Sequence, residues 1–159
     1  MGREGHVFWY YGMPEDEASE MARKFGERDI QDAMDKIEDA LLRHCKSVLK
    51  ESGGNDFVSY DIEVWSCPEP GIYVIEETRY KGDEANSISY TAVESKDEAT
   101  EEARRALRGV AEWLSEWIDD ARDMAKKKKG WEREAWEEIA NTLETEAESL
   151  EELAGRLRL

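Results

Sequence analysis

The sequence predicts a single α+β domain spanning residues 1–159, in which antiparallel strands form a central sheet and amphipathic helices flank it. Between residues 57 and 93, apolar and polar residues alternate in three short runs separated by turn residues, as in an antiparallel meander. On both sides, apolar residues recur every three or four positions, as in amphipathic helices. A chain of 159 residues that is 40% hydrophobic can form one buried core. We expect a three- to four-stranded sheet (a β-meander) in the order β-α-α-β-β-β-α-α, ending in a long antiparallel helical hairpin.

The first third of the chain predicts one strand and two helices. Residues 6–11 are an aromatic, β-favouring run between two glycines. Residues 14–25 predict a helix, because a leading proline suits the first helical turn. Asp29 is a suitable N-cap for a second helix, which we expect to end at Gly53-Gly54. The apolar stripe of this second helix comprises Ile30, Ala33, Met34, Ile37, Leu41, Cys45 and Val48.

Three strands are predicted at residues 57–67, 72–80 and 87–93. Turn residues separate them, with Pro-Glu-Pro-Gly at 68–71 and Lys-Gly-Asp at 81–83. The alternation is strictest in the first strand, so we expect one of its faces to be buried. The residues on that face are Val58, Tyr60, Ile62 and Val64.

The last third of the chain predicts the helical hairpin. Ser95 and Glu98 form a capping box that opens a helix, and Gly130 ends it after four lysines. A final helix at 131–157 has an apolar seam close to a heptad repeat. At 1.5 Å per residue each arm is about 40–50 Å long, so we expect part of the hairpin to protrude or to pair with another copy. The seam comprises Trp136, Ala140, Leu143, Ala147, Leu150, Ala154 and Leu157.

The net charge of −17 is concentrated in two segments. Residues 55–94 have a net charge of −7 and residues 131–159 one of −6, whereas residues 95–130 are neutral. Phosphates would repel such a chain, so we expect no direct contact with nucleic acid or membranes. No run of 18 apolar residues and no signal peptide is found, which favours the cytoplasm (the host cytoplasm if the protein is viral). There we expect both cysteines to be reduced.

A row of glutamates marks the predicted final helix. These residues repeat at three- and four-residue steps on the face opposite the apolar seam. A rigid carboxylate row can imitate a phosphate backbone, although a solvated helix face that keeps the protein soluble has the same pattern. The predicted partner-binding surface consists of Glu134, Glu137, Glu138, Glu144, Glu148, Glu151 and Glu152, together with Asp61, Glu63, Glu76 and Glu77 from the strands.

One short motif points to an enzyme instead. Asp61-Ile62-Glu63 within a strand resembles the first motif of the DEDD-type 3′–5′ exonucleases, where an Asp-x-Glu binds catalytic metal ions. The meander and the helix after it also resemble the opening of a ribonuclease-H-like fold. This resemblance implies a metal-dependent nuclease or phosphodiesterase using Asp61 and Glu63. The sequence departs from that pattern after residue 94, where no further strand is predicted to carry the remaining acids.

The other candidate residues favour structural roles. His44 and Cys45 are consecutive on the predicted helix and diverge by about 100°, so they do not suit one metal ion together with Cys67. The α-β-β-β-α order resembles the double-stranded-RNA-binding domain, but the helix at Ser95 begins with acids where that family requires bases. We therefore predict no catalytic residues, no metal and no cofactor. The six tryptophans are expected in the core, in the hairpin packing or at an interface.

The sequence thus favours a non-enzymatic binding protein whose partner is a basic, nucleic-acid-binding protein or complex. Small acidic α+β proteins of this kind look like phage-encoded inhibitors, including anti-CRISPR proteins that imitate DNA, and like immunity proteins that block nucleases. Two alternatives remain open. One is the nuclease described above, and the other is an assembly protein that forms a homodimer through the helical hairpin.

Overall fold

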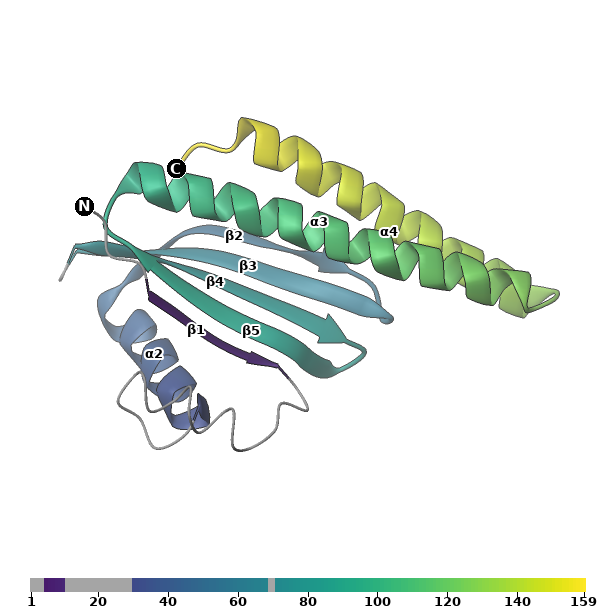
Figure 1. Cartoon of the computed structure of the whole chain (residues 1–159), viewed down its shortest axis with the longest axis horizontal. Helices are drawn as coiled ribbons and strands as arrows, with labels where there is room; N and C mark the ends of the chain where they lie inside the picture. Colours follow the sequence, from purple (N-terminus) through teal and green to yellow (C-terminus); the bar gives the residue numbers. More distant parts are fainter. Residues whose placement is uncertain (1–4, 11–29, 69–70) are drawn as a thin grey trace.

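The computed structural model describes residues 5–10, 30–68 and 71–159, and it confirms the α+β class. The described residues form three layers, with helix α2 (Ile30–His44) on one face of an antiparallel sheet and helices α3 (Lys96–Lys126) and α4 (Trp131–Arg156) on the other (Figure 1). The helix expected at 14–25 lies outside the described residues. No described helix combines the length and the hydrophobicity that crossing a membrane requires.

Within the described residues, five strands form a single sheet in the order β1-β5-β4-β3-β2. All neighbouring pairs are antiparallel. Strands β2 to β5 follow one another as a meander, and β1 closes the far edge by pairing with β5. The strands are β1 (Gly5–Tyr10), β2 (Lys46–Gly54), β3 (Val58–Cys67), β4 (Ile72–Lys81) and β5 (Glu84–Val93).

Strand β2 corrects the sequence prediction, which continued the second helix to Gly53-Gly54. The helix ends at His44, and Lys46–Gly54 pairs along the edge of β3. The helical spacing of Cys45 and Val48 is accidental, because Val48 is exposed on the strand. Without β2, the outer edge of β3 would leave its backbone groups unpaired, so tertiary pairing overrides the local pattern.

The turn between β2 and β3 explains the glycine pair that suggested a helix end. The Asn55 side-chain oxygen accepts hydrogen bonds from the backbone N–H groups of Phe57 (3.0 Å) and Val58 (3.1 Å). A Cβ atom on Gly53 would lie 2.7 Å from both Glu146 Oε2 and the Tyr60 hydroxyl oxygen. Both atoms are the far ends of side chains that can shift. Gly54 is the position that requires glycine, because its φ is 109° and a Cβ atom there would lie 2.4 Å from the Val58 carbonyl oxygen.

The main core lies between the sheet and the helical hairpin. The predicted face of β3 is buried there, and the seam residues of α4 pack beside it, with Leu143 0% exposed and Leu150 2% exposed. The predicted capping box opens α3, with the Glu98 backbone N–H donating to Ser95 Oγ at 3.1 Å. Near the same end of the hairpin, the Arg104 guanidinium of α3 donates to the carbonyl oxygen of Leu157, directly after α4, at 2.7 Å, which links the two arms.

The hairpin leaves the sheet at a cluster of aromatic rings. Phe57 packs edge-on against Trp117 and Trp136, with both ring centroids at 5.3 Å. Beyond this cluster the two helices continue past the sheet and pack on each other alone (Figure 1). The predicted protrusion of the hairpin is thus confirmed.

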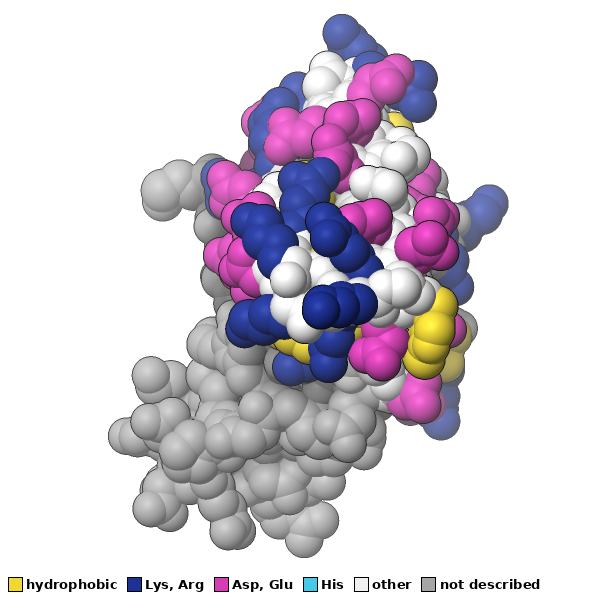
Figure 2. All heavy atoms as spheres, turned by 90° about the vertical axis from the view of Figure 1, so that its right-hand side faces the viewer, with side chains coloured by type: hydrophobic (Ala, Val, Ile, Leu, Met, Phe, Trp, Pro, Cys, Tyr) yellow, Lys and Arg dark blue, Asp and Glu magenta, His cyan; other side chains and the backbone are white. Residues whose placement is uncertain are grey.

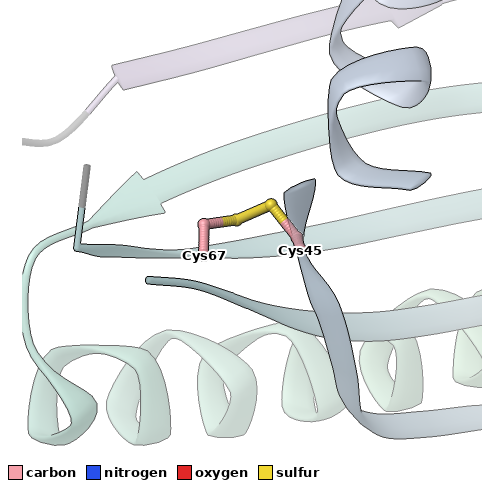
Figure 3. The surroundings of a disulfide bond; sticks show 2 residues. All are labelled: Cys45 and Cys67. Carbon is pink, nitrogen blue, oxygen red and sulfur yellow. A yellow bond between two sulfur atoms is a disulfide. The ribbon is translucent and has the colours of Figure 1, made fainter. Parts of the chain in front are cut away.

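A smaller core lies on the opposite face, beneath α2. Leu41 of α2 packs there with Val74 and Tyr90 of the sheet. Cys45, directly after α2, forms a disulfide with Cys67 of β3, with an S–S distance of 2.03 Å (Figure 3). The prediction of two reduced thiols was wrong. The two cysteines are 22 residues apart, and only the pairing of β2 with β3 brings them together.

We predict that Leu143→Ala and Leu150→Ala each lower the free energy of unfolding by about 2–4 kcal/mol, because each leaves a cavity in the main core. Leu42→Ala is the matched control, since Leu42 is 71% exposed, and it should change stability by less than about 0.5 kcal/mol. Urea unfolding monitored by circular dichroism measures all three. Core variants as stable as Leu42→Ala would contradict the packing of α4.

We also predict that the double variant Cys45→Ala/Cys67→Ala loses about 2–4 kcal/mol of stability, because the disulfide restricts the unfolded chain. Unfolding in urea without a reductant measures this loss. A reductant should bring the parent down to the level of the variant and leave the variant unchanged. Titration of two free thiols in the unreduced, denatured parent would contradict the bond.

Candidate functional site

Apart from Glu77, the acidic residues singled out in the sequence fall into two surfaces on opposite sides of the molecule. Asp61, Glu63 and Glu76 lie on the face of the sheet that α2 covers, because their alternate neighbours face the hairpin. The glutamates of α4 lie on the other side, along the outer surface of the hairpin. The structure therefore does not join the two sets into one patch.

A polar cavity of about 190 Å³ contains the sheet carboxylates. It lies beside the apolar cluster under α2. Lys50, Glu63, Glu76 and Tyr90 are consecutive partners across strands β2 to β5. Two carboxylates thus stand side by side in the sheet with a lysine next to them. The cavity is lined by Glu38, Lys50, Asp61, Glu63, Glu76, Thr78 and Tyr80.

Burial dominates the electrostatics of Glu76. It raises the pKa of the carboxyl group above the ordinary value, because the charged form loses its hydration. Hydrogen bonding from Tyr90 acts in the opposite direction, and the charges of Glu38 and Glu63 raise the pKa further. Glu76 is thus the carboxylate of this cavity that resists ionisation.

The other two carboxylates are held by hydroxyl groups. The Tyr80 hydroxyl donates to Asp61 Oδ2 at 3.0 Å, and Ser47 Oγ donates to Glu63 Oε2 at 2.6 Å. Burial, followed by this contact with Asp61, raises the pKa of Tyr80 to about 12. In the described part of the chain, no three His, Cys, Asp or Glu side chains converge on a point that suits a metal ion.

Glu77 belongs to neither surface. It faces the hairpin and forms an ion pair with Arg79 at 2.7 Å. The Arg79 guanidinium in turn lies over the Trp113 ring, 5.5 Å from its centroid, and the Lys81 ammonium lies 4.8 Å from the Trp117 centroid. Glu77 is therefore part of the packing beneath α3.

Ion pairs divide the predicted row on α4. Glu137 pairs with Arg133 at 3.0 Å, and Glu144 pairs with Arg122 of α3. Glu152 approaches Arg156 at 3.9 Å. The remaining members are exposed and form no ion pair with another described residue: Glu134, Glu138, Glu148 and Glu151.

Comparisons with protein-family models, with curated proteins and with solved structures found no match to this chain. The surfaces of the molecule alone bear on what it binds.

A shallow groove runs between the two helices on the outer side of the hairpin. Its volume is about 350 Å³. Ala111 and Ile118 of α3 and Ala147 of α4 form its floor, and all three are buried. Two unpaired carboxylates of the α4 row, Glu148 and Glu151, form part of its rim. The groove thus combines an apolar floor with negative charge.

The free end of the hairpin has the opposite charge. Figure 2 views the molecule from this end and shows basic side chains gathered there, with acidic side chains around them. Lys126, the last residue of α3, and Lys127–Lys129, which follow it, lie at this end of the hairpin. Trp131 begins α4 beside them and is 77% exposed. Its position directly after Gly130, outside the seam that begins at Trp136, was the available signal in the sequence.

We predict that Glu76→Gln is increasingly more stable than the parent as the pH rises from about 4 to 7. The folded protein holds the proton of Glu76 at pH values where the unfolded chain releases it, so ionisation makes folding less favourable. The parent therefore loses stability as the pH rises through the raised pKa, while glutamine has no charge to bury. Urea unfolding at the two pH values measures the difference.

Exposed Glu116→Gln is the matched control, for which no pH-dependent difference from the parent is expected. A stability difference between Glu76→Gln and the parent that is the same at both pH values would contradict the burial argument.

Proposed function

We propose that the protein is a non-enzymatic binding protein that occupies a basic site on a nucleic-acid-binding partner through the outer face of α4. The observation that carries the proposal is the row of exposed carboxylates on one long, well-anchored helix. Residues three and four apart on a helix are separated by about 4.5–6 Å along its axis. Negative charges in a nucleic-acid backbone also follow one another at spacings of several ångströms.

Rigidity supports the α4 row over the sheet carboxylates as the binding surface. The seam of α4 is buried along its length against α3 and the sheet, so the row is held in place before any partner arrives. A preorganised surface loses less entropy on binding. Asp61, Glu63 and Glu76, in contrast, lie in a cavity and are held by neighbouring side chains, which leaves them less accessible to a protein partner.

The class of protein that fits this surface is an inhibitor that imitates nucleic acid. Phage-encoded anti-CRISPR proteins and the immunity proteins that block nucleases are inhibitors of this kind. Viral origin and action in the cytoplasm belong to this proposal. The Cys45–Cys67 disulfide weighs against the cytoplasm, because such bonds persist mainly in oxidising compartments.

A second candidate function is a metal-dependent nuclease or phosphodiesterase centred on Asp61 and Glu63. The observation in its favour is that both side chains line one cavity with Glu76. We predict no cleavage of DNA, RNA or phosphodiesters with Mg²⁺, Mn²⁺ or Zn²⁺, because Asp61 and Glu63 are engaged by Tyr80 and Ser47. Metal-dependent cleavage by the parent that Asp61→Asn abolishes would establish the nuclease instead.

The binding proposal is tested by affinity capture of a partner from native host extract, followed by titration of the purified partner. The triple variant Glu138→Lys/Glu148→Lys/Glu151→Lys reverses charges that no described residue neutralises. We expect it to weaken binding by about tenfold or more at about 0.1 M salt, and excess DNA or RNA to compete with the parent. Isothermal titration calorimetry measures both the affinity of the triple variant and the competition by DNA or RNA.

The matched control is Glu112→Lys/Glu116→Lys/Asp120→Lys, which reverses three exposed charges on α3. It carries the same net charge as the first variant, so a loss of affinity caused by total charge alone would appear in both. Equal affinities of the parent and both variants, unchanged between low and high salt, would refute the proposal.

A further inference from the structure

The free end of the hairpin presents two unpaired lysines beside an exposed indole. Lys126 lies 3.9 Å from Asp123, and Lys128 lies 3.7 Å from Glu132. Lys127 and Lys129 are exposed and form no ion pair with another described residue. We call Lys127, Lys129 and Trp131 the basic tip.

The outer groove of the hairpin has the complementary composition. Glu148 and Glu151 are exposed, are one helical turn apart and form no ion pair with another described residue. The apolar floor below them is unoccupied by any described side chain. At about 350 Å³, the groove lies at the lower end of the about 300–1,000 Å³ typical of sites for small molecules, which is room for one indole ring.

We propose that the basic tip of one copy docks into the outer groove of a second copy. The Trp131 indole then covers the floor formed by Ala111, Ile118 and Ala147, and Lys127 and Lys129 approach Glu148 and Glu151. Covering the indole removes apolar surface from water, and the two lysines complement two carboxylates that form no ion pair with a described residue of their own chain.

A second copy is favoured as the occupant because both complementary surfaces lie on the same chain. The net charge of −17 opposes association at long range, but salt screens charges beyond about 8 Å at physiological ionic strength. Because the tip lies at the end of the part of the hairpin that extends past the sheet, it can approach an acidic surface while its own acidic body stays farther away (Figure 1). Contacting pairs are screened less than distant ones, so local complementarity decides the outcome.

The contact joins two different surfaces, so each copy retains one free tip and one free groove. Such head-to-tail contacts form rings where the rotation closes and open chains where it does not. One indole and two ion pairs bury little area, so we expect association only at about 0.1–1 mM protein. The contact uses two carboxylates of the proposed partner-binding face, so self-association and partner binding compete.

The test is a charge-swap complementation followed by analytical ultracentrifugation at about 0.15 M salt. The first variant, Lys127→Glu/Lys129→Glu, carries an acidic tip, and the second, Glu148→Lys/Glu151→Lys, carries a basic rim. Each alone places like charges in contact and should sediment as a single chain. Their equimolar mixture restores opposite charges at both kinds of contact and should associate at least as strongly as the parent. Lys46→Glu/Arg158→Glu, at exposed positions, is the control for the first variant and should associate like the parent or more weakly by less than about twofold.

Trp131→Ala tests the apolar half of the contact and should weaken association about tenfold or more, with an unchanged melting temperature because the ring is exposed. A parent that stays a single chain throughout this concentration range would overturn the proposal. So would a mixture that fails to associate when the parent does. Binding of the tip to anionic vesicles or single-stranded DNA, without self-association, would overturn it as well. The variant Lys127→Glu/Lys129→Glu keeps every carboxylate of the α4 row, so it should still bind the nucleic-acid-binding partner. A loss of self-association is thereby distinguished from a failure of the partner-binding proposal.

Discussion

The alternation of apolar and polar side chains along β3 is the constraint on which the rest of the structure depends. Every second residue from Val58 to Val64 is buried beneath the hairpin, so the intervening residues must lie on the other face of the sheet. This strand is the one that pairs with β2 and β4 at the same time. It therefore fixes where the hairpin packs, and it also places Asp61 and Glu63 in the polar cavity and Cys67 beneath the end of α2.

The parts of the fold predicted from the sequence are those whose cause is local. The alternation in β3, the capping box at Ser95 and the heptad-like seam of α4 each depend on residues close together in the chain, and all three are confirmed. Strand β2 and the disulfide were missed because their cause is distant. Lys46–Gly54 becomes a strand because the edge of β3 needs a partner, and Cys45 meets Cys67 only after that pairing forms.

The candidate sites divide in the same way. The sequence located the acidic residues of the α4 row, since helical spacing alone puts them on one face. The pairs of Glu137 with Arg133 and of Glu152 with Arg156 have an i,i+4 spacing that is visible in the sequence. The ion pair between Arg122 and Glu144 crosses from one helix to the other and leaves no such signal. The sheet carboxylates are separated from that row because they lie on the face of the sheet that α2 covers, whereas α4 packs on the opposite face. Charge counted along a chain therefore overstates the charge that a partner meets.

The distribution of charge along the hairpin gives the molecule a polarity that its net charge hides. The outer face of α4 presents carboxylates, whereas at the free end Lys126–Lys129 and Gly130 lead into an exposed tryptophan, Trp131. Lysines at the end of α3 complement the helix dipole, and that role needs neither an exposed indole nor a hairpin that extends past the sheet. Trp131 buries little surface against the described residues of its own chain, since it is 77% exposed. The free end is thus better explained by a contact outside the chain than by the stability of the fold, and the groove between the same two helices supplies an apolar floor with carboxylates of opposite charge on its rim.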